Sequence, residues 1–139
     1  MTLSNSDLVT AGVVLLAVVT IAYGGTFVLR VVTGGQPANR LQKDFYRAGH
    51  AHAGVLVILG LVVLILTSSP GVPGWANSGG TAVLWAAILM PAGFFLSVIG
   101  KDPQRPSKLI VLLWLGAAVL TVGLVTAGVG LVLAGSTAS

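Results

Sequence analysis

The chain has no cysteine and very few charged side chains. The absence of cysteine among its 139 residues excludes disulfides, thiol catalysis, Cys-ligated zinc and iron–sulfur clusters. Charged residues make up 7% of the chain, whereas an average soluble domain has roughly 25%. So few charges cannot keep a folded surface in water, and 55% of the residues are hydrophobic. The composition therefore predicts a membrane protein whose surface is solvated mainly by lipid.

Acidic residues are especially scarce. Asp7, Asp44 and Asp102 are the only three, and each lies near the end of an apolar segment. No carboxylate is therefore available at membrane depth to orient a histidine or to bind a metal cation or sodium. His50 or His52 could act as a base, but nothing identifies a nucleophile. An enzyme is the least supported class of function.

Four apolar segments are long enough to cross a bilayer, since a membrane-spanning helix needs about 20 residues. Turn-forming residues, mainly glycine and proline, separate them. The sequence predicts one all-α domain over residues 1–139, a bundle of four transmembrane helices in two tandem hairpins. The expected spans are at about residues 8–30, 45–68, 81–100 and 109–134. No basic residue precedes the first span, so we expect it to be retained and not cleaved as a signal peptide.

The basic residues give the expected orientation. All seven Lys and Arg residues lie in or beside the first and third connections. The positive-inside rule then places loops 31–44 and 101–108 in the cytoplasm, and both termini outside. The expected location is the cell (plasma) membrane, and lipid is the first expected partner. Because the positive charge follows the membrane loops, we expect no nucleic-acid partner.

Two histidines on the second span carry most of the possible chemistry. His50 and His52 are about 200° apart around a helix, so they face nearly opposite sides. One metal ion cannot bind both from a regular helix, and they are weak metal candidates. His50 also continues a basic stripe at helical spacing, which predicts contact with anionic lipid or another anionic ligand. The stripe consists of Arg40, Lys43 and Arg47.

Helix lengths suggest a polar cluster in the inner leaflet. If Arg47 marks the interface, His50 lies roughly 4–5 Å and His52 roughly 7–8 Å inside it. Three residues of other spans fall at similar depths, and we expect them to join the histidines: Tyr23, Thr26 and Ser97. Ionisable residues at membrane depth are functional-site candidates. The alternative is that both histidines are neutral and bond neighbouring helices together.

Small residues predict where helices pack closely. Gly49 and Gly54 flank the histidines and leave room for another helix or a flat ligand. The fourth span has one face of small residues. That face predicts packing within the bundle or, alternatively, self-association between chains. Its members are Gly116, Gly123, Ala127, Gly130 and Ala134.

These features leave three functional hypotheses. The first is proton-linked or small-solute transport by an oligomer, with the histidine site exchanging protons. The second is an accessory or structural subunit of a larger membrane complex, so we expect a homo-oligomer or a partner membrane protein. The third is binding of haem or copper through His50 or His52, although no cofactor is the primary expectation.

Overall fold

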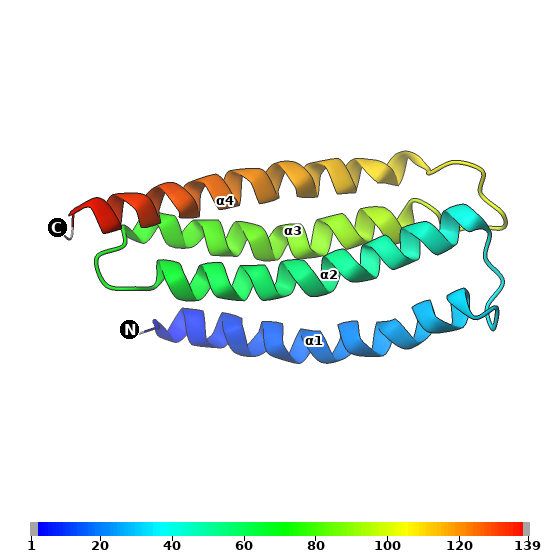
Figure 1. Ribbon diagram of the computed structural model, residues 1–139, viewed down its shortest axis with the longest axis horizontal. Coiled ribbons are helices and arrows are strands. Elements are labelled where there is room, and N and C mark those ends of the chain that lie inside the picture. Colours follow the sequence, from blue (N-terminus) through cyan, green and yellow to red (C-terminus); the bar gives the residue numbers. More distant parts are fainter. Residues whose placement is uncertain (1–2, 138–139) are drawn as a thin grey trace.

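A computed structural model of the chain describes residues 3–137 and contains four long helices. They are α1 (Asn5–Val32), α2 (Arg40–Thr67), α3 (Asn77–Leu96) and α4 (Val111–Thr137), and they lie side by side (Figure 1). Each helix is long and apolar enough to cross a membrane. No strand occurs within residues 3–137. The all-α prediction is confirmed, and the four apolar helices suggest a membrane protein.

Hydrogen-bonding side chains define the helix starts. Ser4 caps α1, and Asn39 caps α2 in a reciprocal pair with Gln42, a capping box. α2 therefore begins at Arg40, five residues before the expected span. Single 3₁₀ turns precede the last two helices, Gly74–Ala76 before α3 and Lys108–Ile110 before α4.

α3 ends at Leu96, four residues before the expected boundary. Its following residues make bonds to other parts of the chain. The backbone N–H of Ser107 donates to the carbonyl of Ser97 (2.7 Å), and Gln42 Nε2 donates to the carbonyl of Val98 (3.0 Å). The last turn is therefore replaced by contacts with the next loop and with α2. Hydropathy does not distinguish such a turn from helix.

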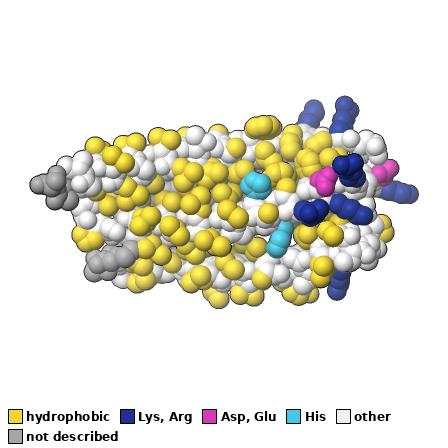
Figure 2. All heavy atoms as spheres, in the orientation of Figure 1, with side chains coloured by type: hydrophobic (Ala, Val, Ile, Leu, Met, Phe, Trp, Pro, Cys, Tyr) yellow, Lys and Arg dark blue, Asp and Glu magenta, His cyan; other side chains and the backbone are white. Residues whose placement is uncertain are grey.

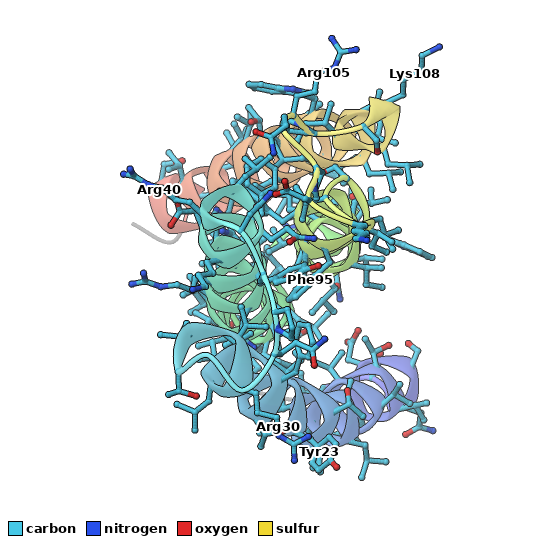
Figure 3. All side chains as sticks on the ribbon, turned by 90° about the vertical axis from the view of Figure 1, so that its right-hand side faces the viewer. Tyr23, Arg30, Arg40, Phe95, Arg105 and Lys108 are labelled. Atoms are coloured by element: carbon cyan, nitrogen blue, oxygen red, sulfur yellow. The ribbon has the colours of Figure 1, made fainter. Side chains whose placement is uncertain are left out.

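Helix α3 packs closely against both α2 and α4, which make little contact with each other, whereas α1 packs mainly against α2. Viewed from one end, α2 and α3 lie between α1 and α4 (Figure 3). Only Asp7 and Val31 of α1 are buried, whereas the buried residues of α2 and α3 run along both helices. The first helix therefore lies at the outside of the bundle and is packed less closely than the other three.

The small-residue face of α4 is covered by α3. A Cβ added at Gly116 would lie 2.9 Å from the backbone nitrogen of Met90, and one at Gly123 would lie 3.0 Å from the carbonyl oxygen of Gly79. Gly130 lies against Ala76 in the same way, and Ala127 is buried. The alternative hypothesis that this face joins two chains is wrong for the folded monomer, because α3 already occupies it.

The two described ends of the chain lie at one end of the bundle, and the α1–α2 and α3–α4 connections lie at the other (Figure 1). The Lys and Arg side chains visible on the face shown in Figure 2 gather at the end with the connections, in keeping with the positions of these residues at 30–47 and 101–108. The bundle is thus strongly asymmetric in charge along its long axis.

Candidate functional site around His50

His50 lies between α1 and α2. A Cβ added at Gly25 would be 3.2 Å from the Nε2 atom of His50 and 3.3 Å from its Cε1 atom. Gly25 therefore gives the imidazole room to pack edge-on against the α1 backbone. Among the described residues, no hydrogen bond to His50 exists. This ring is half-buried and keeps its hydrogen-bonding capacity unused.

His52 lies on the other side of α2, as its spacing from His50 predicts. Its Nδ1 atom is 2.8 Å from the carbonyl oxygen of Ala48, one turn earlier in the same helix. A carbonyl oxygen only accepts, so Nδ1 carries the proton and the neutral ring keeps its lone pair on Nε2. The ring packs on Phe94 of α3, with centroids 5.0 Å apart. Both its orientation and its tautomer are fixed.

The expected five-residue polar cluster does not form. Tyr23 is 78% exposed and points away from the other helices (Figure 3). The hydroxyls of Thr26 and Ser97 donate to carbonyl oxygens of their own helices, those of Tyr23 and Phe94. The sequence analysis grouped these residues because they lie at similar depths in the membrane. Depth does not determine how each helix is rotated about its own axis, and therefore does not determine which side chains face one another. Of the two histidines, only His50 makes no hydrogen bond within residues 3–137.

An aromatic group lies one turn from His50 on the side of the basic loops. Tyr46 of α2 contacts Phe27 of α1 edge-to-face (centroids 5.3 Å apart) and stacks on Phe95 of α3 (5.5 Å). Phe95 lies in the interior, among the helices (Figure 3). These three rings, the aromatic group, join α1, α2 and α3 below the histidine. Gly49 allows this contact, because Phe95 packs directly against it.

Above His50, the space between α1 and the core is open. A cleft of about 660 Å³ runs along α1, α2 and α3. Ala53 and Val57 of α2 form part of its floor, with Ala87 and Pro91 of α3. Ala53 lies one turn above His50 on the same face of α2, so the histidine, which does not itself line the cleft, lies one turn beyond its inner end. Hydropathy did not predict the cleft, since its residues are as apolar as the core.

A polar group closes the other end of the cleft. The carboxylate of Asp7, 9% exposed, accepts hydrogen bonds from the Ser4 hydroxyl (2.8 Å), from the Ser68 hydroxyl (3.2 Å) and from Asn77 Nδ2 (3.3 Å). This Asp7 group joins the start of α1 to the end of α2 and the start of α3. The sequence analysis missed it, although Asp7 is the only acidic residue far from every cation, which could have marked it.

The basic stripe and the remaining predicted residues lie apart from the cleft. Arg40 and Arg47 are exposed, and Arg40 makes one surface ion pair with Asp44 (4.0 Å). Lys43 is half-buried beside them. Gly54 has open space where its side chain would lie, so it does not pack against another described helix. Contact of the stripe with anionic lipid stays a prediction.

The geometry also bears on cofactors. His50 and His52 face different helices, and residues 3–137 contain no cluster of three or more His, Cys, Asp or Glu side chains. The two histidines of one chain therefore do not point toward a common metal position. Haem or copper bound by one histidine from each of two chains stays a prediction, which an absorption spectrum of the purified protein would test. No protein-family model, no curated protein and no solved structure matches this chain.

Proposed function

We propose that this chain is a multi-pass protein of the cell membrane that carries a small solute in a proton-linked manner. The observation that supports this proposal is the place of His50. It is an ionisable side chain within a membrane-length helix, with no hydrogen bond among the described residues, one turn beyond the residues that line a cleft. An imidazole can bind and release a proton, and ionisable side chains at membrane depth are candidates for such transfer.

Helix α1 is the element that would move. The Asp7 group and the aromatic group hold it near its two ends, and between them its inner face lines the cleft and touches the core through Val14 and Ile21. Few contacts need to break for α1 to tilt, and segments with few buried contacts open at low free-energy cost. Protonation of His50 would weaken its packing against the apolar backbone at Gly25 and so favour that movement.

In this proposal, loops 31–44 and 101–108 face the cytoplasm and both termini face outside. The cleft then ends on the cytoplasmic side near His50 and the aromatic group. Four helices are too few to enclose a wide pathway, so the working unit is a homo-oligomer or includes a partner membrane protein. Its contact surface is not the small-residue face of α4, because α3 covers that face.

Proton movement into liposomes tests the proposal. The purified protein is reconstituted with a trapped pH-sensitive dye, and glycerol or lactate is added outside in turn as a neutral and an anionic probe solute. We expect proton movement that requires the protein and one of the solutes. His50→Gln should reduce it to the level of protein-free liposomes, because glutamine keeps the size but cannot titrate.

His52→Gln is the matched control. His52 is bonded within its own helix and lies on the side of α2 away from α1, so its loss should leave the proton signal close to that of the unmodified protein. Equal signals from His50→Gln and the unmodified protein would contradict the role of His50. A signal no greater than that of empty liposomes with either solute would contradict the transport proposal for these probes.

The second candidate is an accessory subunit of a membrane assembly. The exposed apolar surface of α1 favours it, since only two residues of that helix are buried. Extraction of native membranes in a mild detergent distinguishes the two candidates. An accessory subunit should co-purify with a partner in fixed proportion, whereas a self-sufficient carrier should be isolated as the chain alone or as its homo-oligomer.

A further inference from the structure

The cleft beside α1 has the dimensions of a small-molecule site. Its volume is about 660 Å³, and ligand sites in proteins commonly measure roughly 300–1,000 Å³. Along α1 it extends from Val9 to Ile21, which is roughly 18 Å at the rise of an α-helix. The cleft is therefore long and narrow, and it lies parallel to the helix axes.

The chemistry of the lining selects an uncharged, mostly apolar ligand. No charged side chain lines the cleft, and its only hydroxyls belong to Thr10, Thr20 and Thr81. Thr20 already donates its hydroxyl to the carbonyl of Ala17. An ion or a strongly polar solute would lose its hydration here without compensation. A hydrocarbon chain makes no hydrogen bonds to water, so it would lose none on entering the cleft.

The cleft is open at the side, between α1 and α3. Trp85 and Ile88 of α3 stand at this opening, 58% and 59% exposed, and few contacts join α1 to α3. In a membrane this side faces the lipid hydrocarbon. A ligand dissolved in the bilayer could enter there without passing through water.

One polar group lies just beyond the inner end of the cleft. His50 does not line the cleft, but it lies one helical turn below Ala53, which does, and its imidazole makes no hydrogen bond within residues 3–137. A ligand whose head extends one turn past Ala53 can complete that hydrogen bond. The site therefore combines an apolar groove with one polar group just past its end.

A helix from another chain fits this space less well. The Asp7 group and the aromatic group hold α1 near both ends and oppose the separation that a helix would need. A single extended chain is the better match.

We propose that the cleft binds the hydrocarbon tail of a single-chain lipid whose uncharged head, a hydroxyl or carbonyl, hydrogen-bonds to His50. This inference assigns the cleft a ligand of its own, distinct from the polar probe solutes above, and it rests on the proposed function only for the movement of the ligand. The tail can be a straight alkyl chain or a branched isoprenoid chain. Both share the chemistry that the cleft recognises.

Photo-crosslinking tests the inference. A diazirine-bearing hexadecanol is titrated into the protein in liposomes, and labelled residues are identified by mass spectrometry. We expect saturable labelling of about one probe per chain on the cleft-lining residues of α1 and α3. Unlabelled hexadecanol and geranylgeraniol should both compete, and the better competitor identifies the tail as alkyl or isoprenoid. Dodecane, which has no head, should compete less well.

Variants separate the cleft from the rest of the lipid-facing surface. Ala17 lines the cleft, whereas Ala22 of the same helix is exposed outside it. Ala17→Phe should abolish saturable labelling, and Ala22→Phe should leave it unchanged. His50→Leu should raise the half-saturating concentration of hexadecanol about 3- to 10-fold, as expected for one lost hydrogen bond. If Ala17→Phe impairs folding, Thr20→Phe fills the same cleft.

Labelling that does not saturate, or that is equal in Ala17→Phe and Ala22→Phe, would overturn the inference and leave only bulk lipid in the cleft. Crosslinks between two chains at the cleft would overturn it in favour of a second copy. These outcomes are distinguishable from failure of the transport proposal. Saturable binding without proton movement would support the site alone, and proton movement without saturable binding would support transport alone.

Discussion

At the residue scale, glycine and alanine decide how closely the helices approach. Gly79 and Gly123 face each other between α3 and α4, and Gly80 lies against Leu64 of α2. Between apolar helices in lipid, association depends on such close packing, because the surrounding lipid is as apolar as the side chains. Gly25 has the same effect at the site, where it makes room for His50. The smallest residues therefore set the positions of the larger ones.

Gly123→Ala should destabilise the bundle. Its new methyl group would lie 2.8 Å from Ala82 Cβ and 3.0 Å from the carbonyl oxygen of Gly79, and overpacking of this kind costs about 1–3 kcal/mol. Gly128→Ala is the matched control, because nothing lies within 4 Å of that position in the same helix. Reversible unfolding in mixed micelles with increasing SDS measures both. Equal stability of the two variants would refute close packing at Gly123.

At the element scale, α1 differs from the other three helices in how it is attached. Helix α3 contacts both α2 and α4 along its length, whereas α1 packs mainly against α2 and has its polar and aromatic contacts near its two ends. At one end a buried carboxylate binds donors from two other elements, and at the other end aromatic rings stack. The cleft is the space that this attachment leaves in between. An element held in this way can move without unfolding the core.

Asp7→Ala should loosen α1 selectively. It removes the acceptor of Ser68 and Asn77, and hydrogen bonds to a charged group contribute about 1.5–3 kcal/mol. The control is Asp44→Ala, which removes only an exposed ion pair at 4.0 Å, a contact expected to contribute about 0–1 kcal/mol. A cysteine placed at Val14, on the inner side of α1, reports the movement through its rate of modification by a lipid-soluble maleimide.

We expect the Val14 cysteine to react faster after Asp7→Ala than after Asp44→Ala. The chain contains no native cysteine, so no other thiol competes for the reagent. Identical reaction rates in the two backgrounds would show that the Asp7 group does not hold α1 in place.

At the scale of the whole molecule, charge distribution is the dominant feature. All seven Lys and Arg residues lie at the end with the α1–α2 and α3–α4 connections, and the termini lie at the other (Figures 1 and 2). Of the three acidic residues, Asp44 and Asp102 lie with the basic ones, so that end carries seven positive and two negative charges, a formal net charge of +5. Such an asymmetry favours one orientation in a membrane.

Single-cysteine labelling tests this orientation. Ser69→Cys lies in the α2–α3 connection and Gln104→Cys in the basic α3–α4 connection. In intact cells, a membrane-impermeant maleimide should label Ser69→Cys, and it should label Gln104→Cys only after the cells are made permeable. The reverse pattern would show that the protein is inserted the other way round.

Composition and periodicity alone predict the class of this protein. Long apolar runs, scarce charges and loop-forming residues between them require four helices, because an unpaired backbone cannot exist in lipid. Helix geometry also predicts that His50 and His52 face nearly opposite sides, because positions two residues apart in an α-helix differ in direction by about 200°. Close packing at Gly49, Gly116 and Gly123 follows from the spacing of small residues. These are local properties, and each can be read from neighbouring positions in the chain.

Which residues of different helices meet depends on how the helices are rotated and how closely they pack. Tyr23 has the depth expected for a site residue but faces away from it, whereas Gly25 faces His50 and Asp7 reaches Ser68 and Asn77. In helices that are apolar all round, hydropathy has no preferred face and cannot predict the rotation. The cleft and the loose attachment of α1 are therefore properties of the packed molecule.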